Sequence, residues 1–204
     1  MPPTAPIGLC IFLQYKVLPI EKKIPHLSCY ALTVEQETAL HHQIEQGKKA
    51  PTNADDQAIF FQTLLDRISP AGYNHYEISN FALPGFESRH NSAYWEGKPY
   101  LGLGPSAHSF DGQKRIWNAA HNLDYMKSIR DGIIPSTSER LSSIDLLNEY
   151  IMTSLRSSKG LNKERIRKQW GEDKLNTITK GIQIALEAGN AIEYNDAWRL
   201  TSKG

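Results

Sequence analysis

The sequence has few cysteines, almost no net charge and no long apolar run. Its 204 residues include only two cysteines, Cys10 and Cys29, which excludes a disulfide framework and leaves too few thiols for a thiolate metal site. Lys and Arg total 23 against 22 Asp and Glu, so no global field draws the chain onto nucleic acid or an anionic membrane. The apolar run from Ile7 to Leu13 is far shorter than the about 20 residues that span a bilayer. No basic residue precedes it, unlike in a secretory signal. These absences predict a cytoplasmic protein in a reducing compartment.

The residues that are present predict a folded α/β chain in the first part. Hydrophobic residues at 40% and charged residues at 22% are ordinary globular usage. Leu27–Val34 and His75–Ile78 are short β-rich runs that predict strands, and Ala58, Phe61, Leu64, Leu65 and Ile68 repeat at helical spacing between them. A shorter polar helix is expected over Ala39–Gly47. This order predicts a βαβ-type fold.

The stretch from Asn80 to Phe110 shows no clear period and is rich in Gly, Pro, His and aromatic residues. Long ordered loops of this kind often carry function. A strand at Arg115–Asn118 and a helix at Leu123–Arg130 follow, and Asp131–Ser136 has the composition of a linker.

The last third is predicted to be a helical module. Helices are expected over 144–155, 163–170 and 175–188, followed by strands at 191–194 and 198–201 joined by Asn195-Asp196. Three helices and a terminal hairpin are typical of a winged-helix-like module. Residues 156–180 hold eight basic against three acidic side chains, which is typical of a solvated helix face and less often of a phosphate-binding one.

The densest chemistry lies at Ser88–Trp95, sequence SRHNSAYW. His90 offers a neutral nitrogen ligand near neutral pH, and Tyr94 and Trp95 offer flat amphipathic surface. This combination suits a planar apolar ligand with a metal at its centre. The alternative is a loop whose histidine and aromatic residues pack onto the sheet.

Other polar groups favour structural interpretations. Gly102–Ala107, sequence GLGPSA, fits the spacing of a dinucleotide-binding turn, but Pro105 removes a needed N–H and no helix opens there. The glycines are expected to let a ligand or a neighbouring backbone come close. The seven histidines do not group as a zinc site, and His41 and His42 are expected on opposite sides of a helix. Glu77, at a predicted strand end, is a candidate polar site residue, although a solvated or ion-paired glutamate is the more common case.

Several segments together resemble the radical SAM haem chaperone family, which is related to oxygen-independent coproporphyrinogen III oxidase. The matching segments are Tyr76–Ala82, Pro84-Gly85, Glu87–Asn91, Tyr94-Trp95, Tyr100–Gly104 and Ala107–Ser109. The resemblance implies the C-terminal part of a partial TIM-like radical SAM barrel followed by a helical, winged-helix-like domain. Residues 1–23 then stay unmatched, 24–135 form the barrel part with the haem motif, and 136–204 form the C-terminal domain.

The resemblance also implies site residues. The family associates an H-N-x-x-Y-W stretch with haem, and this stretch carries over as His90, Asn91, Tyr94 and Trp95, with His90 as the iron ligand. Arg89 is placed to meet a haem propionate. Ala31 and His108 fall where relatives line the S-adenosylmethionine pocket.

One departure from the family concerns the cluster. Relatives hold a [4Fe–4S] cluster through a C-x-x-x-C-x-x-C loop, whereas Cys10 and Cys29 are nineteen residues apart. We therefore expect a truncated haem chaperone that binds haem for delivery to other haem proteins, or that works with a separate N-terminal half. The alternatives are a winged-helix module for nucleic acid or a protein partner, and a non-functional gene fragment. Duplex nucleic acid is not expected as a partner.

Overall fold

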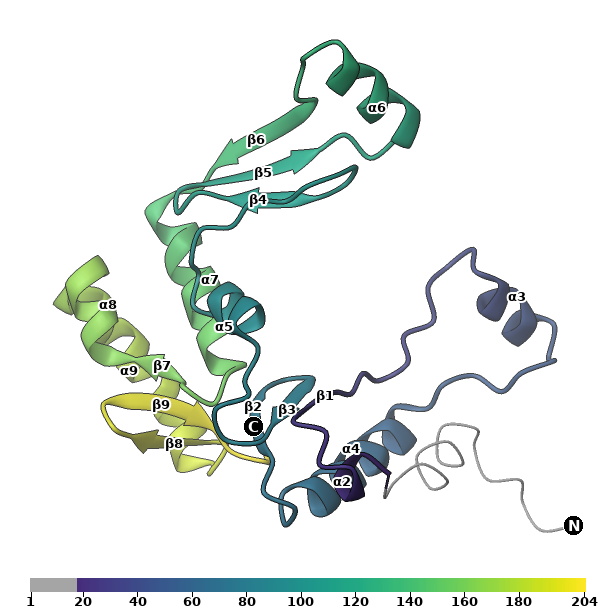
Figure 1. Ribbon diagram of the computed structural model, residues 1–204. Helices are drawn as coiled ribbons and strands as arrows, with labels where there is room; N and C mark the ends of the chain where they lie inside the picture. The colour runs from purple at the N-terminus through teal and green to yellow at the C-terminus, as the bar shows by residue number, and fades with distance from the viewer. Residues whose placement is uncertain (1–17) are drawn as a thin grey trace, which may run out of the picture. The chain divides into compact units, whose positions relative to one another are not determined.

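The computed structural model describes residues 18–204, whose elements are labelled in Figure 1. Residue contacts divide the chain into two compact units, one ending at Glu87 and the other running from Ser88 to Gly204. Cys10 and most of the predicted 1–23 segment lie outside the described residues. No helix within 18–204 is long and apolar enough to cross a membrane.

The first unit is a three-stranded sheet with one long helix beside it. The sheet has the order β1-β3-β2, and both neighbouring pairs are antiparallel. Its elements are α2 (Leu18–Glu21), β1 (His26–Ser28), α3 (Ala39–Glu45), α4 (Ala54–Ile68), β2 (Asn74–Glu77) and β3 (Asn80–Ala82). The core of the unit is fully buried Phe81 with Leu64, Ile68 and Tyr73.

Helix α4 confirms the helical spacing read from the sequence. Asn53 caps its first turn, because the Asn53 side-chain oxygen accepts the Asp55 N–H at 2.8 Å. Leu64 and Ile68, four residues apart, share one face and are both buried. Gly72, with φ of +89°, allows the turn that leads into β2.

The first predicted strand is much shorter than Leu27–Val34. Strand β1 ends at Ser28, and only the Cys29 N–H continues the pairing, to the Ser79 carbonyl at 2.7 Å. On the other side of Ser79, the segment that pairs with β1 turns back into β2. Residues 30–34 therefore have no neighbouring strand among the described residues. Strands β1 and β2 run in the same direction with α3 and α4 between them along the chain, as a βαβ-type fold predicts, but β3 lies between them in the sheet and is antiparallel to both.

The second unit contains two more antiparallel sheets, with orders β4-β5-β6 and β7-β9-β8. Its elements are α5 (Arg89–Trp95), β4 (His108–Phe110), β5 (Lys114–Asn118), α6 (Asn122–Arg130), β6 (Ser136–Arg140), α7 (Ser143–Leu155), β7 (Leu161–Asn162), α8 (Lys163–Trp170), α9 (Glu172–Glu187), β8 (Ala191–Tyr194) and β9 (Ala197–Leu200). The strand at 115–118 and the helix at 123–130 are thus confirmed within one residue.

The expected linker at Asp131–Ser136 is wrong. Ser136 begins β6, which pairs with β5 over five residues from Asn118↔Ser136 to Lys114↔Arg140. Both sides of residue 136 therefore belong to one sheet. The boundary between 24–135 and 136–204 stays a prediction, while the residue contacts separate the units after Glu87.

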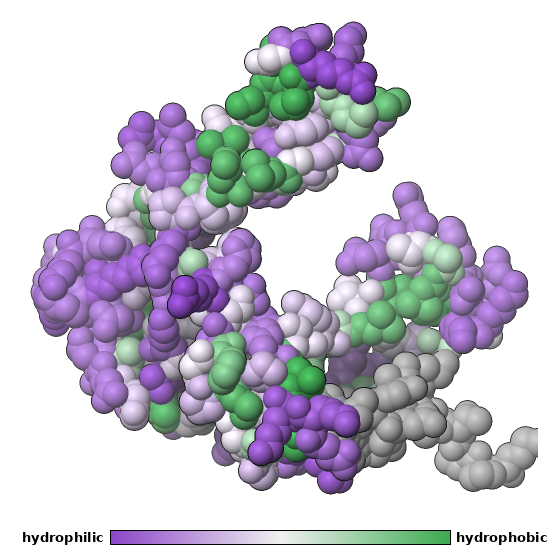
Figure 2. All heavy atoms as spheres, viewed as in Figure 1, coloured by the Kyte–Doolittle hydropathy of each residue, from purple (hydrophilic) through white to green (hydrophobic). Residues whose placement is uncertain are grey.

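The β4–β6 sheet has no apolar core of its own. Its buried side chains are Ser109 and Asn118, both polar. Around α6, Leu123, Ile133 and Ile134 are 67%, 60% and 72% exposed. Figure 2 shows such apolar residues at the surface of the segment around α6, next to polar ones. The apolar side chains of this sheet, such as Ile116 and Trp117, are therefore at most half-buried.

The C-terminal helices and hairpin confirm the winged-helix-like module. Its core includes fully buried Leu161, Ile166 and Trp198, which come from β7, α8 and β9. Helix α7 starts at a capping box, in which Ser142 and Asp145 satisfy each other's backbone N–H groups. Asn195 and Asp196 both have positive φ, 47° and 59°, which is the conformation of a tight two-residue hairpin turn.

Candidate functional site

The SRHNSAYW segment forms helix α5, so the irregular stretch expected over 80–110 was wrong here. The Ser88 hydroxyl accepts the Asn91 N–H at 3.3 Å and caps the start of the helix. Gly97, with φ of +66°, ends it. These two residues are the sequence signals that indicate a two-turn helix.

Helix geometry sorts the candidate residues of α5 into separate faces. His90 and Tyr94 are four residues apart and lie one above the other, and both are exposed. No hydrogen bond or ion pair in the described chain engages the His90 imidazole. Trp95 is half-buried, and its ring meets the Tyr94 ring edge-on at 5.7 Å. The helix thus offers an unpartnered imidazole with an aromatic ring on the same face.

Asn91 and Arg89 lie on either side of that face. Asn91 is half-buried and, through its spacing, shares a stripe with Trp95. Arg89 is exposed at the first helical position and forms no ion pair among residues 18–204. Asn91 and Trp95 thus form a half-buried stripe beside the exposed His90 and Tyr94, while Arg89 lies on the other side of His90.

Glu96 anchors the end of α5 to the helical module. Its carboxylate accepts from the Lys159 and Lys98 ammonium groups, and its carbonyl accepts from Arg165 Nη1 at 3.1 Å. The hydrogen bond from Lys159, then that from Lys98, lowers the pKa of the Glu96 carboxyl. The ordering of α5 therefore depends partly on an ionised Glu96.

Replacing Glu96 by glutamine should lower stability in a pH-dependent way. A depressed folded pKa stabilises the protein above the unfolded pKa, and this contribution is lost as pH falls through the folded pKa. Because the pair is partly exposed, we expect Glu96→Gln to lower the free energy of unfolding near neutral pH by less than about 1 kcal/mol. The difference should close only in acid, as the pH falls through the lowered pKa of the folded Glu96 carboxyl. Urea unfolding at two pH values measures it, and Glu187→Gln, outside any ion pair in the described chain, is the control. A difference that persists in acid would contradict this role.

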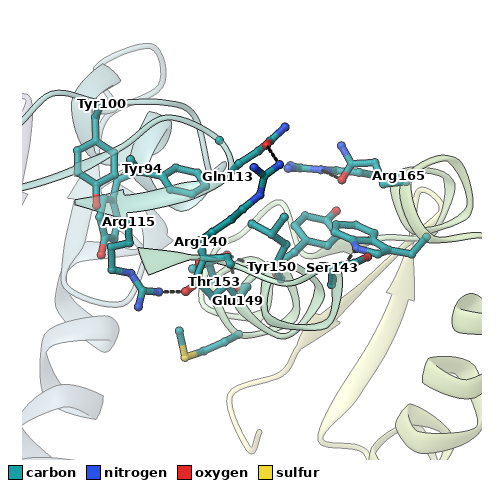
Figure 3. A pocket seen from close by; sticks show the side chains of 18 residues that line it. Tyr94, Tyr100, Gln113, Arg115, Arg140, Ser143, Glu149, Tyr150, Thr153 and Arg165 are labelled. Carbon is teal, nitrogen blue, oxygen red and sulfur yellow. Dashed lines mark hydrogen bonds and ion pairs between the residues drawn. The ribbon is translucent and has the colours of Figure 1, made fainter. Parts of the chain in front are cut away.

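A cavity of about 580 Å³ lies between α5, the β4–β6 sheet and helices α7 and α8, all within the second unit. Tyr94 and Tyr100 line one part of it and Tyr150 another (Figure 3). Trp170 also lines the cavity. The Tyr150 and Trp170 rings are stacked, with centroids 5.5 Å apart and planes 19° apart. The cavity therefore has flat aromatic surface and shares Tyr94 with the His90 face.

Three arginines and one carboxylate give the cavity a net positive charge. Arg115 is neutralised, since it pairs with Glu139 at 2.7 Å and also with Glu149. Arg140 donates only to Gln113 Oε1, at 2.8 Å. Arg165 donates to a carbonyl and to Gln169, and lies 4.2 Å from the Tyr150 ring centre. Arg140 and Arg165 thus have no carboxylate partner in the described chain.

Sequence reasoning missed these arginines. Arg140 lies on β6 and Arg165 on α8, far apart along the chain, and no local sequence pattern links either of them to Tyr94.

Several known proteins with similar sequences are named heme chaperones. The chain is 31% identical over 193 residues to heme chaperone HemW of Lactococcus lactis, covering 91% of this chain and 48% of the relative. It is 34% identical over 148 residues to heme chaperone HemW of Mycobacterium tuberculosis, covering 72% of this chain and 38% of the relative. It is also 43% identical over 83 residues to the mouse mitochondrial radical S-adenosyl methionine domain-containing protein 1, covering 41% of this chain and 19% of that one. No family model matches the chain.

The solved structure of coproporphyrinogen III oxidase (HemN) from Escherichia coli, a radical SAM enzyme, has the same fold. It aligns over 100% of this chain and 50% of that one, with a TM-score of 0.71 and 18% identity. The chain belongs to the radical SAM haem chaperone family. It corresponds to the C-terminal half and spans about half, or less, of the length of the curated relatives it matches. The expected fold, a partial radical SAM barrel followed by a winged-helix-like domain, is confirmed.

The family's S-adenosylmethionine candidates, Ala31 and His108, are both exposed. Ala31 lies just after β1 in the first unit, and His108 begins β4 in the second. Their assignment to an S-adenosylmethionine pocket stays a prediction.

In the glycine turn before His108, the backbone at Gly102 lies close to the backbone at His108. The sequence predicted that these glycines admit either a ligand or a neighbouring backbone, and the structure shows a neighbouring backbone. A Cβ on Gly102 would lie 2.1 Å from the His108 carbonyl oxygen. The Gly102 N–H donates to Ser109 Oγ at 2.9 Å, and the Asn118 side-chain amide donates to the Gly104 carbonyl at 2.9 Å. The turn is a structural part of the β4–β6 sheet.

The cysteines do not fit the family's cluster. Cys29 is half-buried and carries a free thiol, and burial raises the pKa of that thiol. A thiol that stays protonated is a poor iron ligand. Cys10, its only possible companion in the sequence, lies outside the described residues.

Two further expectations for the first unit were wrong. His41 and His42 both direct Nδ1 toward Glu45, at 3.8 and 3.2 Å, because the histidine side chains bend to the same carboxylate. These three exposed or half-exposed donors are one ligand short of a structural zinc site. Glu77 is 4% exposed and accepts from the Asn80 amide, so it is neither solvated nor ion-paired.

Proposed function

We propose that the chain binds haem through helix α5 and acts as a haem-carrying member of its family. The observation that supports this most is the exposed, unpartnered His90 imidazole with Tyr94 on the same face. Two of the relatives are named heme chaperones. Delivery of haem to an acceptor protein, with or without a separate N-terminal half, is part of this proposal.

The residues of α5 suit one face of a haem. A neutral imidazole ligates ferric iron at one axial position. Tyr94 is 50% exposed and can cover part of the macrocycle, which gains free energy by burying flat apolar surface. Trp95 supports the Tyr94 ring from its edge, and Asn91 borders the same side.

A nucleic-acid function of the winged-helix-like module has less support. Three of its basic side chains are paired within the module: Arg167 pairs with Glu164 and Glu172, Lys168 with Glu164, and Lys163 with Glu193. A cation that is already paired with a carboxylate neutralises few phosphates and so displaces few counterions from nucleic acid. Such cations add little affinity for nucleic acid.

Haem titration followed by the Soret band tests the proposal. We expect His90→Ala to bind ferric haem at least about tenfold more weakly and to lose the spectrum of an imidazole-ligated haem, because the axial ligand is gone. The matched control is His121→Ala, an exposed histidine in the same unit whose imidazole, within the described part of the chain, pairs only with Asp124. The assignment fails if His90→Ala binds as tightly as the unsubstituted chain, or if His121→Ala loses as much.

A further inference from the structure

We propose that the cavity beside α5 holds the carboxylate-bearing edge of a tetrapyrrole, with Arg140 and Arg165 pairing its carboxylates and Tyr94 contacting its ring. This inference rests on the proposed haem binding and names the polar contacts that α5 itself lacks. It draws on the geometry of the cavity and on the charges that line it.

The cavity has the size and lining of a ligand pocket. Its volume of about 580 Å³ lies within the roughly 300–1,000 Å³ usual for small-molecule sites. Such sites combine apolar walls with a few fixed polar groups. Here the stacked Tyr150 and Trp170 rings are a wall, and the polar groups include two guanidinium groups without a carboxylate.

The Arg165 guanidinium is fixed in position by its contacts and keeps free N–H donors for an anion. Its guanidinium lies over the Tyr150 ring, and Tyr150 is fixed by its stacking on Trp170 and by the Asn162 N–H, which donates to the Tyr150 hydroxyl at 3.1 Å. Of the five N–H donors of a guanidinium, two are engaged, by the Glu96 carbonyl and by Gln169. The remaining donors suit a carboxylate, which guanidinium binds in a two-pronged geometry.

Arg140 supplies the second positive charge. It extends from the end of β6 toward Gln113, and Arg165 extends from α8 into the same cavity (Figure 3). The only carboxylate lining the cavity, Glu149, is already paired with Arg115. An entering dianion therefore meets two cations and no unpaired acid among the lining residues.

Tyr94 connects this cavity to the iron ligand. Tyr94 lines the cavity and lies one helical turn from His90, a rise of about 6 Å along the axis. A macrocycle whose iron meets His90 and whose face meets Tyr94 extends toward the cavity. Its carboxylates, at the ring edge, are the groups that Arg140 and Arg165 can pair.

The test uses two probes on the 204-residue chain: ferric haem, followed by its Soret band, and metal-free protoporphyrin, followed by its fluorescence. We expect Arg140→Gln and Arg165→Gln each to weaken both probes about tenfold, since hydrogen bonds to charged groups are worth about that much. Arg130→Gln, on α6 and outside the cavity, is the control and should change neither. A tetracationic porphyrin with the same ring should not bind.

The outcomes separate this inference from the proposed function. His90→Ala should weaken haem but not protoporphyrin, which has no iron to ligate. If His90→Ala weakens haem while both arginine variants bind protoporphyrin normally, the cavity assignment is overturned and the haem proposal stands. If the arginine variants weaken both probes while His90→Ala changes nothing, the iron ligand is wrong and the cavity stands.

A further variant, Arg140→Glu, distinguishes loss of binding from loss of folding. Arg165 also packs on Tyr150, whereas the Arg140 side chain has Gln113 as its only partner within residues 18–204. Arg140→Glu should therefore leave the thermal unfolding midpoint nearly unchanged and weaken protoporphyrin more than Arg140→Gln does. Normal protoporphyrin binding by a folded Arg140→Glu chain would overturn the inference.

Discussion

Replacing Gly102 by alanine is expected to lower the local stability of the β4–β6 sheet by about 2–3 kcal/mol, since overpacking of a tight site costs that much. The added Cβ would lie 2.1 Å from the carbonyl oxygen of His108 and 2.9 Å from its nitrogen. These are backbone atoms of β4, so no flexible side chain can move aside. The sheet must shift, and it has no apolar core of its own to absorb the change.

Amide hydrogen exchange measures the local stability of the β4–β6 sheet residue by residue. Amides of β4 and β5 should exchange roughly 30 to 150 times faster in Gly102→Ala, while amides of α9 keep their protection. The control is Gly181→Ala, because Gly181 lies inside α9 with nothing within 4 Å of an added Cβ. That change should stabilise α9 by up to about 1 kcal/mol, so the two substitutions have opposite signs. Equal protection of β4 in Gly102→Ala and the unsubstituted chain would show that the close approach is absent in solution.

Elements with strong local signals were predicted well from the sequence. Helices α4, α7, α8 and α9 have an apolar stripe at helical spacing, and each stripe packs into a core. The final hairpin was indicated by Asn195-Asp196, whose positive φ angles match a tight turn. In these places local preference and tertiary packing favour the same structure.

Elements whose structure depends on distant partners were predicted less well. The β-rich run after Ser28 contains the residues of a strand, but it has no neighbour to pair with among the described residues. Conversely, Ser136–Arg140 is polar and exposed throughout, yet it is a strand because β5 pairs with all five residues. Strand formation is set by pairing partners, which composition does not reveal.

The candidate site shows the same division. His90 and its neighbours could be singled out because they are close in sequence and match a family pattern. Arg140 and Arg165 could not, since β6 and α8 bring them to the cavity from separate parts of the chain. The capping by Ser88 was the local signal that would have placed His90 and Tyr94 on one helical face.

Anaerobic reconstitution of the 204-residue chain with iron and sulfide is expected to give no [4Fe–4S] cluster. A cluster needs three or four thiolates placed close together, and the sequence supplies two cysteines nineteen residues apart. Burial raises the pKa of the Cys29 thiol, which further disfavours the thiolate. We expect well below one firmly bound iron per chain after gel filtration, and no cleavage of S-adenosylmethionine.

Cysteine variants make that result specific. Cys29→Ser and a variant lacking both thiols should retain the same small amount of iron as the unsubstituted chain, because the residual iron is not thiolate-bound. A brown species with close to four irons per chain, lost in these variants, would show that two chains or other ligands complete a cluster. The haem titration is independent of this outcome, since the His90 imidazole needs no thiolate beside it. Absence of a cluster together with haem binding would separate haem binding by this chain from the radical chemistry of its family.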